Sequence, residues 1–202
     1  QGGTLVTALF PFDINIWYGA IAQGVMVDDW ADDNFDHSGL GFIGGASLHV
    51  YTEKHPIGAA AMGTFGKVER RWGSEWKGFI KENAGRTQTA YMQTNTFPYE
   101  HTWADLDPNV RDPYGDPVLR VTHGPKLNEP MAAGHAANKM EEWFRAAGAS
   151  DIVNTGGGVG PGLSTHAHGG TRMGNNPETS VCDPWGFSFE AKNLGIIGGS
   201  VM

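Results

Sequence analysis

The sequence predicts an α+β fold, in which helices cover one side of a mostly antiparallel sheet. Short segments rich in Thr, Val and aromatic residues alternate with glycine-containing turns, an order typical of strands joined by hairpins. Only two segments have helical periodicity, and residues 128–148 form the longer one. The 202 residues are 40% hydrophobic and include 30 glycines, enough for one sizeable core with many tight turns.

The predicted strands follow one another along the chain with turns between them. Residues 1–27 are apolar and turn-rich and predict one or two strands, and residues 46–53 alternate in polarity. Residues 87–97 combine Thr with aromatic side chains, which favours a strand. A Pro–Gly turn introduces a strand over residues 118–122, and the apolar run at residues 192–200 predicts the last strand.

Two helices complete the predicted fold. The first spans residues 73–85, with Ser74 placed to cap its N-terminus, and its expected buried stripe is Trp76, Phe79 and Ile80. The second spans residues 128–148, with Asn128 as the N-cap and Gly148 as the stop signal. The apolar spacing of this second helix predicts a buried stripe formed by Met140, Trp143, Phe144 and Ala147.

Charge and composition exclude several classes of protein. The net charge of −8 argues against nucleic acid as a partner, because no basic stripe is present to neutralise phosphates. The most apolar window, residues 4–27, is interrupted by proline, aspartate and glycine, so no membrane span is expected. Cys182 is the only cysteine, which rules out an internal disulfide. Because the chain starts at Gln1 and stops just after an apolar run, we expect a fragment of a longer protein.

A glycine motif at residues 39–44, "GLGFIG", matches the dinucleotide pattern G-x-G-x-x-G. That pattern binds a pyrophosphate when it joins a strand to a helix, so that the helix N-terminus meets the phosphates. Here an acidic segment precedes the motif and a predicted strand follows it. We therefore interpret residues 39–44 as an ordinary glycine turn. The run "GGGVGPG" at residues 156–162 lacks both the spacing and the lysine of a phosphate loop.

His166 and His168 form an H-x-H pair, which on a strand would place both imidazoles on one face. A protein metal site requires a third ligand, and the spacing nominates neither His123 nor His135. We therefore assign no metal site. An H-x-H metal enzyme remains an alternative interpretation of this motif.

Three ordered motifs together resemble the glucose-methanol-choline (GMC) oxidoreductases, a family of FAD-dependent alcohol and sugar dehydrogenases and oxidases. They are "DLDPNVRDPYGDPVLRVTHG" at residues 105–124, "THAHGGTRMG" at residues 165–174 and "NLGIIGGS" at residues 193–200. The strings "DNFDHSGLGFIGG" at residues 33–45 and "RWGSEWK" at residues 71–77 are similar to the bacterial gluconate and sugar dehydrogenase branch. The family's FAD fingerprint and its second catalytic residue would both lie outside this chain.

The resemblance implies a role for each candidate residue. His166 would be the general base, since imidazole, with an ordinary pKa of about 6.5, is neutral enough to accept a hydroxyl proton. Arg172 would anchor its loop internally. The remaining implied residues bind FAD (Gly169, Gly170, Thr171, Gly198, Gly199 and Ser200) or the substrate (His168, Trp17 and Tyr91).

The resemblance also implies an organisation and partners. Residues 1–163 would form part of a substrate-binding lobe, and residues 164–202 would form the C-terminal edge of an FAD-binding domain. The substrate would be a small alcohol, a sugar or a sugar acid, and a cytochrome or another acceptor would take the electrons. A periplasmic location would require an export signal before Gln1. A non-catalytic carbohydrate-binding or scaffold module is the alternative from outside the enzyme classes.

Overall fold

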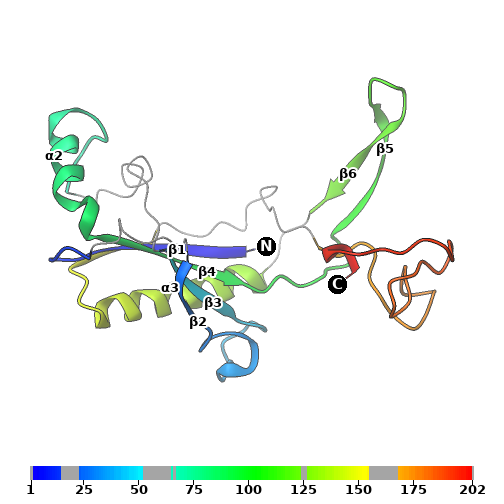
Figure 1. The fold of residues 1–202 in the computed structure, drawn as a ribbon, viewed down its shortest axis with the longest axis horizontal. Helices are drawn as coiled ribbons and strands as arrows, with labels where there is room; N and C mark the ends of the chain where they lie inside the picture. Colours follow the sequence, from blue (N-terminus) through cyan, green and yellow to red (C-terminus); the bar gives the residue numbers. More distant parts are fainter. Residues whose placement is uncertain are drawn as a thin grey trace. The chain divides into compact units, whose positions relative to one another are not determined.

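The computed structural model describes the chain except for residues 1, 15–22, 52–64, 66, 124–126, 155–167 and 202 (Figure 1). Two compact units are present. The first combines Phe97–Pro125 with Gly160–Met202, and the second combines Gly2–Thr96 with Lys126–Val159.

The second unit contains a five-stranded sheet in which every pairing is antiparallel. The strand order is β2-β3-β4-β1-β7. This architecture confirms the predicted α+β class, and four of the strands lie where the sequence predicts them. Strand β7 follows the long helix and was not predicted. The bounds are β1 Gly2–Leu9, β2 Gln23–Val27, β3 Ala46–Tyr51, β4 Thr87–Thr94 and β7 Asp151–Asn154.

Helix α3, Asn128–Ala146, covers one face of this sheet (Figure 1). Small and large apolar side chains pack together in the resulting core. Helix α2, Gly73–Asn83, continues through a 3-10 turn at Ala84–Arg86 into β4. The core consists of Val6, Ala8, Phe10, Ala46, Leu48, Val50, Ala90, Met92, Ala136, Ala137, Met140 and Phe144. No helix in the described ranges is long and apolar enough to cross a membrane.

The predicted stripe on α3 is only half correct. Met140 and Phe144 are fully buried, whereas Trp143 is half-buried beside the core and Ala147 is exposed. The reason is that Ala147 lies beyond the last helical turn, and the helix meets the sheet through small side chains instead. These are Ala132, Ala133, Ala136 and Ala137. On α2, Phe79 is buried, while Trp76 and Ile80 are half-buried.

Both predicted N-caps are wrong. Helix α2 begins at Gly73, one residue before Ser74, so Ser74 already lies in the first turn and the capping position belongs to Trp72. Asn128 is likewise the first residue of α3 and makes no capping bond. Its side-chain amide instead pairs with the backbone of Ile43, accepting from the Ile43 N–H at 2.8 Å and donating to the Ile43 C=O at 3.1 Å.

That pairing attaches the acidic glycine loop at residues 28–45 to α3. His135 adds a second attachment, because its ring stacks on Phe35 at 5.7 Å and contacts Phe42 at 5.5 Å. Strand β3, not a helix, follows the loop, which confirms that residues 39–44 form a glycine turn and lack the strand-turn-helix context of a dinucleotide site. Three of its glycines have positive φ, at Gly39, Gly41 and Gly44.

Acid should weaken the attachment at His135. Burial lowers the pKa of His135 below 6.5, Lys139 lowers it further and Glu142 opposes this. Between that lowered pKa and 6.5 the unfolded chain binds more protons than the folded one, so stability falls as the pH falls through this window. When the pH is lowered from above 6.5 to below it, the free energy of unfolding should fall less for His135→Gln than for the parent. Urea unfolding at both pH values measures this. Equal losses in both proteins would contradict the assignment.

The first unit contains a hairpin of β5, Trp103–Arg111, and β6, Pro117–Thr122, which confirms the turn and the strand expected at residues 118–122. Asp105 and Arg120 form an ion pair across it, and the guanidinium lowers the pKa of the Asp105 carboxyl.

The strand predicted at residues 192–200 is wrong. These residues fold back in a narrow turn, with one isolated bridge between Phe187 and Gly195, and then form a 3-10 turn at Gly199–Val201.

Candidate functional site

Two glycine-containing segments that are far apart in the sequence form a short backbone ladder in the first unit. The amide of Gly169 donates to the carbonyl of Gly199 at 3.0 Å, and the amide of Thr171 donates to the carbonyl of Ser200 at 2.9 Å. A third bond joins Met173 to Val201 at 2.9 Å. This glycine ladder, residues 169–173 and 198–201, contains all six residues that the sequence nominates for cofactor binding.

The ladder requires glycine and leaves space beside it. Gly169, Gly170 and Gly198 have φ values of +78°, +101° and +134°, a region that side chains other than glycine rarely adopt. A Cβ added at Gly170 or Gly198 would find no heavy atom within 4 Å among the described residues. The backbone is therefore open at these two positions, so that a planar group can approach it directly.

A layer behind the ladder fixes its position. The thiol of Cys182, which is fully buried, donates to the carbonyl of Thr171 at 3.0 Å. The amide of Gly174 donates to the carbonyl of Cys182 at 2.9 Å. The Nε of Arg172 donates to the carbonyl of Thr179 at 2.7 Å. This confirms that Arg172 anchors the loop internally.

One polar atom in the ladder is left without a partner. The hydroxyl oxygen of Thr171 is buried and makes no hydrogen bond to any described residue. A buried hydroxyl of this kind costs about 1–3 kcal/mol unless a ligand or water satisfies it. The open backbone at Gly170 and Gly198, together with this hydroxyl, fits a planar ligand with polar edges, such as a flavin.

The ladder also borders a cleft of about 1120 Å³ within the same unit. One wall comes from residues 98–102, before β5, and the other from residues 169–190. No motif in the sequence marks the first wall, so its residues could not be predicted from the sequence. The cleft is lined by Pro98, Tyr99, Glu100, Thr102, Gly169, Gly170, Arg172, Pro177, Glu178, Thr179, Ser180, Val181, Ser188, Phe189 and Glu190.

The other nominated residues do not all join this site. His166 and Trp17 lie outside the described residues. His168 is exposed and directly precedes the ladder, and it makes no side-chain hydrogen bond to another described residue. Tyr91 lies on β4, in the other compact unit. In the described part of the chain, no three His, Cys, Asp or Glu side chains are grouped to hold a metal ion.

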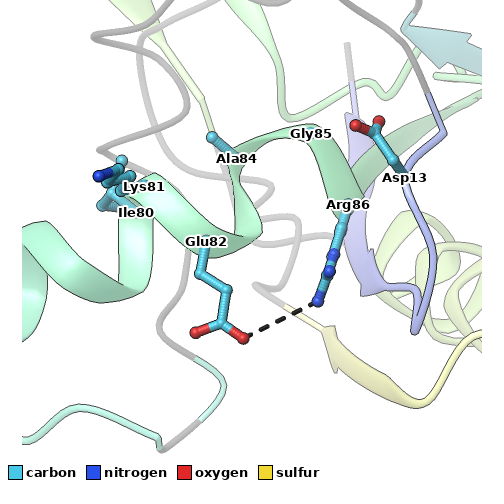
Figure 2. Close-up of a pocket in the computed structure, with 7 residues that line it drawn as sticks. All are labelled: Asp13, Ile80, Lys81, Glu82, Ala84, Gly85 and Arg86. Carbon is cyan, nitrogen blue, oxygen red and sulfur yellow. Dashed lines mark ion pairs between the residues drawn. The ribbon is translucent and has the colours of Figure 1, made fainter.

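A second, smaller pocket of about 490 Å³ lies where the end of α2 meets the segment after β1 (Figure 2). Arg86 points toward Glu82 across it, and their side chains form an ion pair at 3.8 Å. The carboxylate of Asp13 lies over Gly85, so closely that a Cβ there would come within 3.0 Å of it. The charged groups are thus directed at other parts of the protein, and we assign no ligand to this pocket.

Comparison with known proteins identifies the class to which this arrangement belongs. A family model described as GMC oxidoreductase matches residues 105–202. The chain is 31% identical, over 92% of its length, to the gluconate 2-dehydrogenase flavoprotein of Pantoea cypripedii. It is 33% identical, over 79% of its length, to the 2-methyl-1,2-propanediol dehydrogenase of Mycolicibacterium austroafricanum. Over 48% of its length it is 32% identical to the paromamine 6'-oxidase of Streptomyces fradiae.

The chain belongs to the GMC oxidoreductase family. It spans 31% of the length of the gluconate 2-dehydrogenase flavoprotein and 29% of that of the propanediol dehydrogenase. The glycine ladder and the cleft wall from residues 169–190 lie within the matched segment, whereas the wall from residues 98–102 precedes it.

Proposed function

We propose that the full-length protein is an FAD-dependent oxidoreductase that oxidises a CH–OH group of a sugar, a sugar acid or another alcohol. The glycine ladder carries this proposal, because an open glycine backbone with an unsatisfied hydroxyl suits a flavin ring. Family membership supports it, as do the relatives, whose names refer to a flavoprotein, to dehydrogenases and to an oxidase. FAD, when bound, supplies the hydride acceptor.

Each residue of the ladder has a proposed part in holding the cofactor. Gly170 and Gly198 let the isoalloxazine ring approach the backbone without a side chain in between. The hydroxyl of Thr171 hydrogen-bonds a polar edge of the ring. Gly169, Gly199 and Ser200 keep the two segments aligned through their backbone bonds.

We propose His166 as the residue that accepts the substrate hydroxyl proton. It precedes Gly169 by three positions, the spacing on which the family resemblance rests. A neutral imidazole takes this proton as the carbon–hydrogen bond breaks, which lowers the barrier to the loss of the hydride. His168 borders the substrate side of the same loop.

The organisation and the electron acceptor are parts of the same proposal. Residues 1–163 contribute to the substrate lobe and residues 164–202 to the flavin site. The substrate is a small alcohol or sugar, and a cytochrome or another separate acceptor reoxidises the flavin.

Gly170→Ala tests the flavin site directly, and Gly115→Ala is a matched control. Both glycines have similar positive φ values, +101° and +95°, and neither Cβ would meet an atom within 4 Å. The two variants should therefore lose similar stability, about 1–2 kcal/mol. Only Gly170→Ala should lower the FAD affinity of the full-length protein, by about tenfold or more, because its methyl group occupies the space for the ring. Equal FAD affinity in both variants would contradict the proposed site.

A further inference from the structure

Positive charge is concentrated in one part of the chain. Residues 67–86, which contain α2, hold six of the fourteen Lys and Arg residues and only three acidic residues, so their net charge is +3. The whole chain has a net charge of −8. A local reversal of sign on an acidic protein favours contact with a negatively charged surface.

The basic side chains at α2 are available for such a contact. Arg71, Lys77 and Lys81 are exposed, and none of them forms an ion pair with another described residue. Lys77 and Lys81 are one helical turn apart, so they lie on the same face of α2. Beside them, a Cβ added at Gly78 would find no neighbouring heavy atom within 4 Å among the described residues, which leaves the surface open. We name Arg71, Lys77 and Lys81 the basic face.

An exposed tryptophan adjoins the basic face. Trp72 is 67% exposed, and the guanidinium of Arg70 lies 5.7 Å from the centre of its ring. Exposed aromatic residues and arginines are enriched in protein–protein interfaces, where the aromatic ring supplies much of the binding energy. The surface at α2 therefore combines apolar area with positive charge.

The acidic glycine loop carries the opposite charge. Residues 28–45 contain five Asp and no Lys or Arg, which gives a net charge of −5. Asp28 and Asp29 are exposed, and Ile43, which is 59% exposed, adds apolar area. The attachments to α3, including the stacked ring of His135, hold the loop in place. Because the loop is already ordered, it can bind a partner at a lower entropic cost.

The two charged surfaces lie at opposite ends of β4. Helix α2 leads through the 3-10 turn into Thr87, the first residue of β4. The loop ends at Gly45, whose carbonyl accepts from the amide of Asn95 at 3.1 Å, directly after the last residue of β4. The eight residues of β4 span about 24 Å, whereas the Debye length at physiological salt is about 8 Å. The two surfaces therefore cannot neutralise each other within one molecule, and Figure 1 shows them apart.

We propose that two copies of the protein form a dimer in which the basic face of each copy binds the acidic glycine loop of the other. A two-fold axis repeats the contact, so that both surfaces of both copies are paired and the assembly is closed. Trp72 of one copy and Ile43 of the other supply the apolar part of each contact. The dimer does not depend on the proposed function, because no residue of the glycine ladder takes part in it.

Sedimentation velocity of the full-length protein tests the dimer. The parent should associate at micromolar concentrations in about 50 mM salt and dissociate in about 500 mM salt, because salt screens exposed charges. Lys77→Glu combined with Lys81→Glu should weaken dimerisation by about tenfold or more, and so should Asp28→Lys combined with Asp29→Lys. Mixed in equal amounts, these two variants should associate again, since each reversed surface then meets a surface of opposite charge.

Arg145→Glu combined with Lys192→Glu is the matched control, because it changes the net charge by the same amount at exposed residues outside both surfaces. It should keep the parental association. A parent that stays monomeric in low salt at about 100 µM would overturn the dimer. Unchanged association in either reversed variant, or no recovery in their mixture, would overturn it as well. If a reversed variant does not fold, Lys77→Gln combined with Lys81→Gln should weaken dimerisation by about threefold, and unchanged association there would refute the dimer.

Discussion

Replacing His166 with alanine in the full-length protein is expected to slow flavin reduction by substrate by about two to four powers of ten. This is the usual effect of removing a general base, because the hydroxyl proton then has no positioned acceptor in the transition state. The bound flavin should be retained, since the glycine ladder that we propose to hold it begins three residues later at Gly169. Anaerobic stopped-flow absorbance of the flavin measures both quantities.

His168→Ala is the control for this experiment. His168 is exposed and makes no side-chain hydrogen bond to another described residue, so its loss should slow reduction by only about tenfold, through disorder of the loop. If His168→Ala abolished reduction while His166→Ala reacted at the parental rate, the two roles would be reversed. Loss of a bound metal in both variants would favour the H-x-H metal enzyme.

Phe144→Ala should give the largest loss of stability, about 3–5 kcal/mol, as expected for removing a large buried aromatic residue. Phe144 is fully buried and meets Phe10 edge to face at 6.3 Å and Trp143 at 5.3 Å. The substitution leaves a cavity between α3 and the sheet that the short alanine side chains beside it cannot fill.

Trp143→Ala is the matched comparison, because Trp143 is on the same helix but only half-buried. Its substitution should cost clearly less than Phe144→Ala in the free energy of unfolding, measured with denaturant. An equal or larger loss for Trp143→Ala would mean that α3 meets the sheet through a different face.

The sequence predicted the strands and helices that have strong local patterns and missed features that depend on distant contacts. The alternation at residues 46–53 and the helical spacing at residues 128–148 are local patterns, and the structure contains the corresponding strand β3 and helix α3. Asn128 was expected to cap its own helix, but an amide from residue 43 competes for the same side chain. Residues 192–200 form an isolated bridge at Gly195 and single backbone bonds instead of a strand, although their apolar composition favours one.

Some parts of the candidate site could be predicted from sequence motifs, and others could not. The two glycine segments carry motifs, and the structure joins them through the bonds of Gly169 and Thr171. The buried hydroxyl of Thr171 and the cleft beside the ladder depend on packing and have no sequence signal. The register that places His49 opposite Tyr91 likewise cannot be read from either strand alone.

The most direct test of the proposed function is an anaerobic titration of the purified full-length protein with a panel of sugars and alcohols, followed by flavin absorbance. We expect a yellow protein with FAD bound in a one-to-one ratio, whose flavin absorbance is bleached by at least one CH–OH substrate and returns when an electron acceptor is added. A colourless protein that binds no FAD, or one whose flavin stays oxidised with every alcohol and sugar, would contradict it.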